Sequence, residues 1–188
     1  MKRINKKGFS LLELLLVLGI IAALIVAAFI VYPKVQDANR AAAEAKNISA
    51  LMAGVKSLYS GQSNYKGLDD QVAYKAKIYP DNMVIGNGTN FVNSYSGTVS
   101  VEASANTSTG EDDSGFRIKY TLLPTITCAK IITEVGSNFY EINANGVTLE
   151  PSTMKPSDIT AACAARDGNA GSDGAYLLLY AEYLINRV

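Results

Sequence analysis

An uninterrupted apolar stretch near the N-terminus constrains this chain more than any other feature. From Leu14 to Tyr32 the sequence LLLVLGIIAALIVAAFIVY holds 19 residues without a charge, and the next charged residue is Lys34. A helix of that length spans roughly 28 Å, which is close to the hydrocarbon thickness of a bilayer. The first segment therefore needs lipid or other apolar helices around it.

The residues before this stretch indicate its orientation. The first eight residues, MKRINKKG, contain no acid and four cations, Lys2, Arg3, Lys6 and Lys7. A basic flank favours the cytoplasmic side, so the C-terminal remainder is expected across the membrane. A cleaved secretory signal fits poorly, because the small residues Ala27 and Ala28 lead into further apolar residues. A plain signal anchor explains the charge and the length, but not Glu13.

Glu13 is an acid at the beginning of the apolar segment. A carboxylate within hydrocarbon costs on the order of 2–4 kcal/mol, so it indicates a functional site and requires a cation as partner. Cleavage after Gly8 would supply one, because Phe9 would then carry a free ammonium group four residues before Glu13.

The sequence KKGFSLLELLLVLGIIAAL resembles the processing site of type IV prepilins. That resemblance implies that a prepilin peptidase cuts between Gly8 and Phe9 and methylates the new amine of Phe9. It also implies a homopolymer, built by inner-membrane pilus assembly machinery, in which Glu13 pairs with the terminal amine of an adjacent subunit. Such a pair sets the axial register, because only a correctly staggered neighbour neutralises both charges.

We expect one helix over residues 9–60, of which residues 9–33 form the transmembrane segment and filament core. Ala-rich composition favours helix in its second half, and Pro33 should bend or locally unwind it. An apolar stripe at steps of three or four predicts that this half packs on a globular head; its members are Val35, Ala38, Ala42, Ala45, Ile48, Met52, Val55 and Tyr59.

Residues 61–188 are expected to form that head. Residues 62–97 are rich in turn formers and predict a loop region with little regular structure, whereas residues 98–103 and 116–122 alternate like two antiparallel strands. Residues 127–135 and 156–166 predict short helices, 139–150 a hairpin around Asn145-Gly146, and 175–185 a buried closing strand. The predicted fold class is α+β, a pilin fold with a long helix on an antiparallel sheet.

The cysteines Cys128 and Cys163 each fall in one of the two predicted short helices. Because the head is expected on the oxidising side of the inner membrane, a disulfide bounding residues 128–163 is favoured over two free buried thiols. Two segments resemble bundle-forming and toxin-coregulated pilins of the type IVb class, namely SLYSGQSNYKGLD and ITCAKIITEVGSNFYEI. The eight-residue leader and the Phe9 position depart from that class and are similar to type IVa pilins.

Composition indicates that the chain is not an enzyme. It has no histidine, which excludes Ser-His-Asp catalysis and HExxH zinc sites, and its 17 basic residues balance 17 acidic ones, unlike a nucleic-acid binder. No catalytic residue and no cofactor is expected. Asp167, Asn169 and Asp173 could offer oxygen ligands to calcium, but the spacing favours a solvated turn and no metal.

The expected function is a structural subunit of a type IV pilus. The prepilin would reside in the inner membrane with a cytoplasmic N-terminus and leave it for a surface filament that serves adhesion, conjugation or aggregation. A minor pilin or a type II secretion pseudopilin is the alternative. The sequence does not distinguish among the surface roles or name a receptor.

Overall fold

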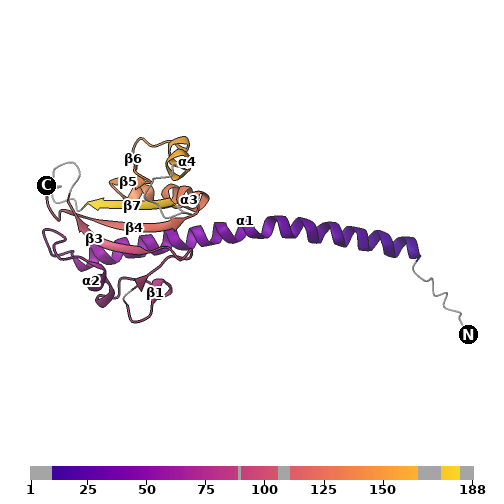
Figure 1. Cartoon of the computed structure of the whole chain (residues 1–188), viewed down its shortest axis with the longest axis horizontal. Coiled ribbons are helices and arrows are strands. Elements are labelled where there is room, and N and C mark those ends of the chain that lie inside the picture. The colour runs from indigo at the N-terminus through magenta and orange to yellow at the C-terminus, as the bar shows by residue number, and fades with distance from the viewer. Residues whose placement is uncertain (1–9, 89, 106–110, 165–174, 183–188) are drawn as a thin grey trace, which may run out of the picture. The chain divides into compact units, whose positions relative to one another are not determined.

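The computed structural model describes residues 10–88, 90–105, 111–164 and 175–182. The chain divides into two compact units, residues 1–38 and 39–188. The helix α1 (Leu11–Leu58) belongs to both units, because it begins in the first and ends in the second. Figure 1 labels it together with most of the other elements.

The first unit is the apolar part of α1. It passes Pro33 without a break in the helix, so the local unwinding expected there does not occur. Proline removes one backbone donor, and the remaining helix tolerates that loss. The large apolar side chains along this unit are exposed, from Leu11 at 77% to Val35 at 50%. Among the described residues, one helix, α1, is long and apolar enough to span a membrane; its most apolar stretch has a mean hydropathy of 3.3 and is not buried. The segment thus has the length and composition to cross a bilayer.

The second unit is built on a five-stranded antiparallel sheet in the order β3-β4-β7-β5-β6. Its strands are β3 (Val99–Ser104), β4 (Gly115–Leu123), β5 (Glu141–Ala144), β6 (Val147–Leu149) and β7 (Ala175–Glu182). The alternating side chains of β3 and β4 pair in register, with Val101 opposite Ile118. The predicted closing strand, β7, lies in the interior of the sheet between β4 and β5. These strands confirm the expected antiparallel head.

The C-terminal half of α1 packs on one face of this sheet. Its buried residues are Ala41, Glu44, Ala45, Ile48, Leu51 and Val55, and its apolar members share one core with buried residues of β3, β4 and β7. Of the predicted stripe, Ala45, Ile48 and Val55 are buried, and Met52 and Tyr59 are half-buried and pack against the core. The prediction was wrong for Val35, which is exposed. The face that packs is rotated by about one residue and includes a glutamate.

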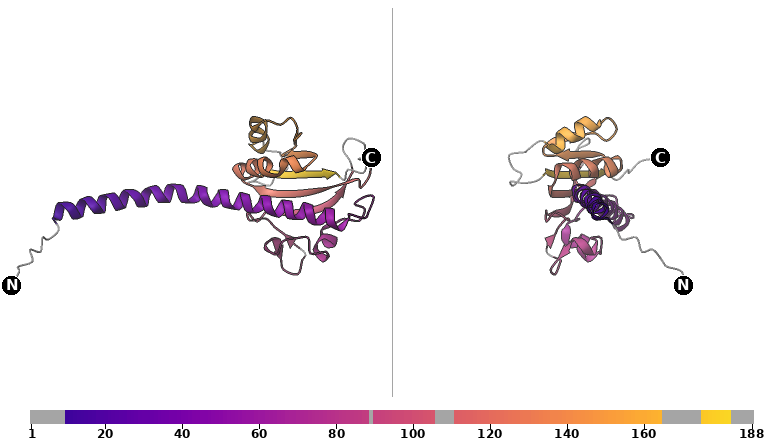
Figure 2. Two further views of the ribbon diagram at one scale, coloured as in Figure 1. Left: turned by 180° about the vertical axis from the view of Figure 1, so that it is seen from behind. Right: turned by 90° about the vertical axis from the view of Figure 1, so that its right-hand side faces the viewer.

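Two helices join the core beside α1. These are α3 (Thr125–Val135) and α4 (Pro156–Ala164), which pack against each other. Both views of the head place α4 on the side of α3 that faces away from α1 (Figures 1 and 2). They agree with the two short helices expected from the sequence, although residues 165 and 166 lie outside the described residues.

The segment 62–97 is more regular than its composition predicts. It contains the short helix α2 (Asp70–Lys75), a 3-10 turn η1 (Asp81–Met83) and a small hairpin of β1 (Val84–Ile85) and β2 (Asn90–Phe91). Aromatic packing organises it, because the rings of Tyr79 and Phe91 stack with centroids 3.8 Å apart. The loop prediction for this segment was wrong for that reason: Tyr79 and Phe91 belong to the core of the head, and Tyr74 packs against it.

This segment also closes the outer edge of the sheet. The backbone N–H of Val101 on β3 donates to the Asp70 carboxylate at 2.6 Å, and the N–H of Ala103 donates to the carbonyl of Leu68 at 3.1 Å. Both donors belong to the edge strand, where they would otherwise face away from the sheet. The edge of β3 is thus capped from within the chain.

Candidate functional site

The residues that the sequence singles out for function fall into three regions. Gly8, Phe9 and the leader cations Lys2, Arg3, Lys6 and Lys7 lie outside the described residues, as do Asp167, Asn169 and Asp173. Glu13 lies in the first turn of α1, and the two cysteines lie in the head. The structure therefore describes Glu13 and the two cysteines, but not the predicted cleavage site between Gly8 and Phe9.

Glu13 lies at the start of the apolar stretch, between two leucines in the sequence. It sits in the first turn of α1, and its backbone N–H donates to the carbonyl of Ser10 at 3.0 Å. Its neighbours Leu12 and Leu14 are 76% and 55% exposed. A carboxylate near a helix N-terminus is favoured by the helix dipole, but in an apolar medium it still lacks a full counter-charge. Among the described residues of this unit, no cation precedes Lys34.

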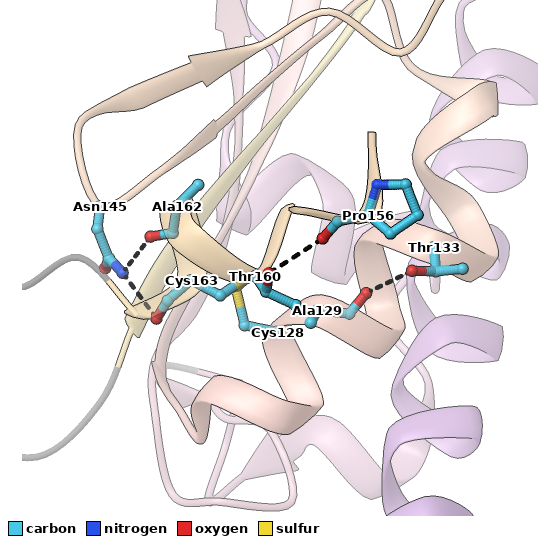
Figure 3. Close-up of a disulfide and its surroundings, with 8 residues drawn as sticks. All are labelled: Cys128, Ala129, Thr133, Asn145, Pro156, Thr160, Ala162 and Cys163. Atoms are coloured by element: carbon cyan, nitrogen blue, oxygen red, sulfur yellow. Dashed lines mark hydrogen bonds between the residues drawn. A yellow bond between two sulfur atoms is a disulfide. The ribbon is translucent and has the colours of Figure 1, made fainter. Parts of the chain in front are cut away.

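The disulfide fixes α3 to α4. Cys128 and Cys163 are bonded, with their Cα atoms 5.8 Å apart and both side chains buried. Figure 3 shows the disulfide between the two helices. Within α3 the Thr133 hydroxyl donates to the Ala129 carbonyl, and within α4 the Thr160 hydroxyl donates to the Pro156 carbonyl. The expected disulfide is confirmed. In the loop-entropy model it stabilises the head by about 4 kcal/mol.

A buried glutamate that the sequence reasoning missed joins α1 to the rest of the head. Glu44 is fully buried, and its carboxylate accepts from the backbone N–H of Ser94 at 2.7 Å and from the Ser94 hydroxyl. Asn47 on the next turn donates to the other carboxylate oxygen at 3.4 Å. The signal available in the sequence was position alone, since Glu44 lies three residues after Ala41 and four before Ile48 on the packed face.

The turn that carries Ser94 also contacts β4 and α3. Asn93 donates through Nδ2 to the carbonyl of Thr121 at 2.8 Å, and the hydroxyls of Tyr95 and Thr127 are hydrogen-bonded at 2.9 Å. Gly97 ends the turn so close to Thr121 that a Cβ would lie 1.8 Å from its carbonyl oxygen. We call residues 93–97 the anchor turn, because they hold the helix, the sheet and the disulfide-bonded helix pair together.

Burial changes the acidity of two tyrosines in this core. Burial raises the pKa of Tyr120 well above its usual value, and the nearby Glu44 carboxylate adds to the effect. Burial also raises the pKa of Tyr79, helped by the hydrogen bond that its hydroxyl donates to Asp70 at 2.7 Å. Both hydroxyls therefore stay protonated wherever the head is folded at ordinary pH.

Comparison with known proteins places this architecture in a family. Residues 38–171 match the family model described as PilS N terminal, which covers more than half of the chain. The chain belongs to the PilS family. Residues 3–29 of this PilS-family chain match the prokaryotic N-terminal methylation motif.

Relatives of the PilS-family chain include two curated proteins from Escherichia coli. The major structural subunit of the bundle-forming pilus from strain E2348/69 is 26% identical over 149 residues, or 78% of this chain and 75% of that protein. The subunit of the same name from O111:H- is 26% identical over 133 residues, or 71% of this chain and 67% of that protein. The family resemblance predicted from the sequence is thereby confirmed.

Solved structures confirm the fold. The type IVb pilin from Salmonella typhi matches with a TM-score of 0.59 at 18% identity, covering 76% of this chain and 99% of that one. TcpA, a type IV pilin from Vibrio cholerae El Tor biotype, matches with a TM-score of 0.50 at 13% identity, covering 77% and 98%. The PilS-family chain thus has a type IVb-like pilin fold, a long helix packed on an antiparallel sheet.

Proposed function

We propose that this chain is the major structural subunit of a type IV pilus. The observation that carries the proposal is the exposed apolar stretch of α1 from Leu11 to Tyr32, in which Glu13 is the single acid and after which the chain continues into a folded head. An exposed apolar surface of this length is stable only in lipid or against copies of itself. The curated relatives are themselves major structural subunits of a pilus, which supports the same role here.

Processing belongs to the same proposal. A prepilin peptidase cleaves between Gly8 and Phe9 and methylates the amine of Phe9, and the match to the methylation motif over residues 3–29 supports this step. The subunit enters the inner membrane with Lys2, Arg3, Lys6 and Lys7 on the cytoplasmic side, because the cations resist translocation. The peptidase performs the chemistry, so this chain is a substrate and not an enzyme.

Glu13 sets the register of assembly. After cleavage the terminal amine and Glu13 are the two opposite charges of the apolar segment. A neighbouring subunit whose amine lies beside Glu13 neutralises both, whereas any other stagger leaves two charges in an apolar filament core. Partners are therefore further copies of this chain, with the inner-membrane assembly machinery feeding subunits into the surface filament.

The decisive experiment compares cells with and without the chain. We expect deletion to abolish the surface filaments seen by electron microscopy, and sheared filaments to contain a chain that begins at methylated Phe9 by mass spectrometry. In Gly8→Ala cells the leader should remain attached. Abundant filaments of normal composition after deletion would contradict a major subunit and favour a minor pilin or pseudopilin.

A further inference from the structure

The turn of the β5–β6 hairpin holds the end of α4. Asn145 adopts a left-handed backbone, with φ of 52°, and Gly146 follows at 83°. The Asn145 side chain is buried, and its Nδ2 donates to the carbonyls of Ala162 at 3.0 Å and Cys163 at 3.2 Å (Figure 3). Carbonyls in the last turn of a helix lack partners within the helix. The amide of Asn145 thus caps the C-terminal end of α4.

The pair Asn145-Gly146 is also chemically reactive. In an Asn-Gly pair the glycine nitrogen attacks the side-chain carbonyl carbon, because glycine offers little steric hindrance. The new N–C bond closes a succinimide ring, and ammonia leaves with the proton of the glycine nitrogen. Water then opens the ring to aspartate or isoaspartate. The reaction needs no enzyme, but it needs a backbone that brings nitrogen and carbonyl together.

The folded head opposes each part of that reaction. The Gly146 nitrogen is engaged, since its N–H donates to Oδ1 of Asn143 at 3.0 Å. The Asn145 side-chain amide is held on the carbonyls of Ala162 and Cys163, so it is not free to turn toward the Gly146 nitrogen. Asn145 is only 6% exposed, which limits the access of water.

The disulfide maintains this arrangement. One of the two carbonyls that accept from Asn145 belongs to Cys163, and the side chain of Cys163 is bonded to Cys128 on α3. We propose that Asn145-Gly146 is a latent deamidation site which the Cys128–Cys163 disulfide protects by keeping the end of α4 on the Asn145 amide.

Deamidation at this position would be irreversible for the head. An aspartate offers only acceptors when ionised, so its carboxylate would face the carbonyl oxygens of Ala162 and Cys163 without a proton to share. The end of α4 would be repelled from the hairpin. Cys163 lies at that end, so it would also move away from Cys128. A subunit that stays reduced for long thereby loses the ability to form its disulfide correctly.

The test measures deamidation in the full-length chain in detergent. Three samples are compared: the oxidised chain, the chain reduced with phosphine and alkylated, and the chain unfolded in urea. Each is incubated at mildly alkaline pH, digested under acidic conditions and mapped by mass spectrometry. We expect Asn145 to deamidate at least tenfold more slowly in the oxidised sample than in urea, and reduction to remove most of that protection. Asn87-Gly88 in the β1–β2 hairpin, where Asn87 is exposed and Gly88 is buried, is followed in the same digests for comparison.

Two variants test the cap itself. Asn145→Asp should weaken protease resistance of the region 128–163 and lower the yield of the correct disulfide. Asn143→Asp is the matched control, because Asn143 uses Oδ1 as an acceptor for Gly146 and a carboxylate keeps that role. Equal deamidation of Asn145 in the oxidised and reduced samples would overturn the proposal. So would an Asn145→Asp chain that resists protease as well as Asn143→Asp.

Discussion

Replacing Glu44 tests how the anchor turn is held to α1. Glu44→Ala removes the acceptor for the Ser94 N–H and hydroxyl. A hydrogen bond to a charged group contributes about 1.5–3 kcal/mol, and the hydrogen bond from the Ser94 hydroxyl adds about 1 kcal/mol. Removing the buried carboxylate also removes its desolvation cost, which offsets part of this loss. We expect a net loss of about 2–4 kcal/mol in the free energy of unfolding. Glu44→Gln keeps one carbonyl acceptor in the same place and should lose about 1 kcal/mol or less.

Urea unfolding of the full-length chain in detergent measures these differences. The chain has eleven tyrosines and no tryptophan, so tyrosine fluorescence and circular dichroism both follow the head. Glu134→Ala, an exposed acid on α3, is the matched control and should change the midpoint little. The reasoning fails if Glu44→Ala unfolds within about 0.5 kcal/mol of the unchanged chain. It also fails if Glu44→Gln is as unstable as Glu44→Ala, since charge rather than the acceptor would then dominate.

Three further predictions concern assembly, the disulfide and alkaline pH. Glu13→Ala should leave membrane insertion and leader cleavage intact but strongly reduce the filaments seen by electron microscopy. Normal filaments would refute the pairing of Glu13 with a terminal amine. Leu12→Ala is the control, because it shortens a neighbouring side chain without removing a charge. The double variant Cys128→Ser with Cys163→Ser should lower the free energy of unfolding by about 4 kcal/mol in the loop model, measured by urea unfolding; an unchanged midpoint would contradict a stabilising disulfide. Burial raises the folded-state pKa of Tyr120 and Tyr79, so their contribution to stability is complete below the unfolded value of 10.0 and is lost as pH rises above it. The free energy of unfolding should then fall by up to about 1.4 kcal/mol per pH unit for each buried tyrosine. Tyr120→Phe should make this fall with pH less steep. An equally steep fall in that variant would exclude Tyr120 as a cause.

Local patterns were sufficient for most of the regular elements. The alternation of apolar residues predicted β3 and β4, and Asn145-Gly146 predicted the hairpin turn because both residues favour the left-handed backbone that the turn requires. The long helix followed from an apolar run and an alanine-rich continuation. These signals are local, so they act without knowledge of the rest of the fold.

Long-range interactions decided what the sequence did not predict. Asp70 and Glu44 are ordinary acids by local pattern, and only the packing of distant segments turns one into a cap for β3 and the other into an acceptor for the anchor turn. The stacking of Tyr79 on Phe91 likewise joins residues 12 positions apart and orders a segment that is rich in turn formers. The position of β7 between β4 and β5 depends on pairing across the whole head.

The capped edge of β3 has a consequence wherever copies of this chain lie close together. An open strand edge pairs readily with the edge of another molecule, and crowded copies would then join through their sheets in any order and number. Asp70 and Leu68 occupy the Val101 and Ala103 donors in advance. At these two positions the edge of β3 therefore offers no unpaired N–H to a strand of another molecule. Two heads that lie side by side are thus less prone to join into one continuous sheet along this edge.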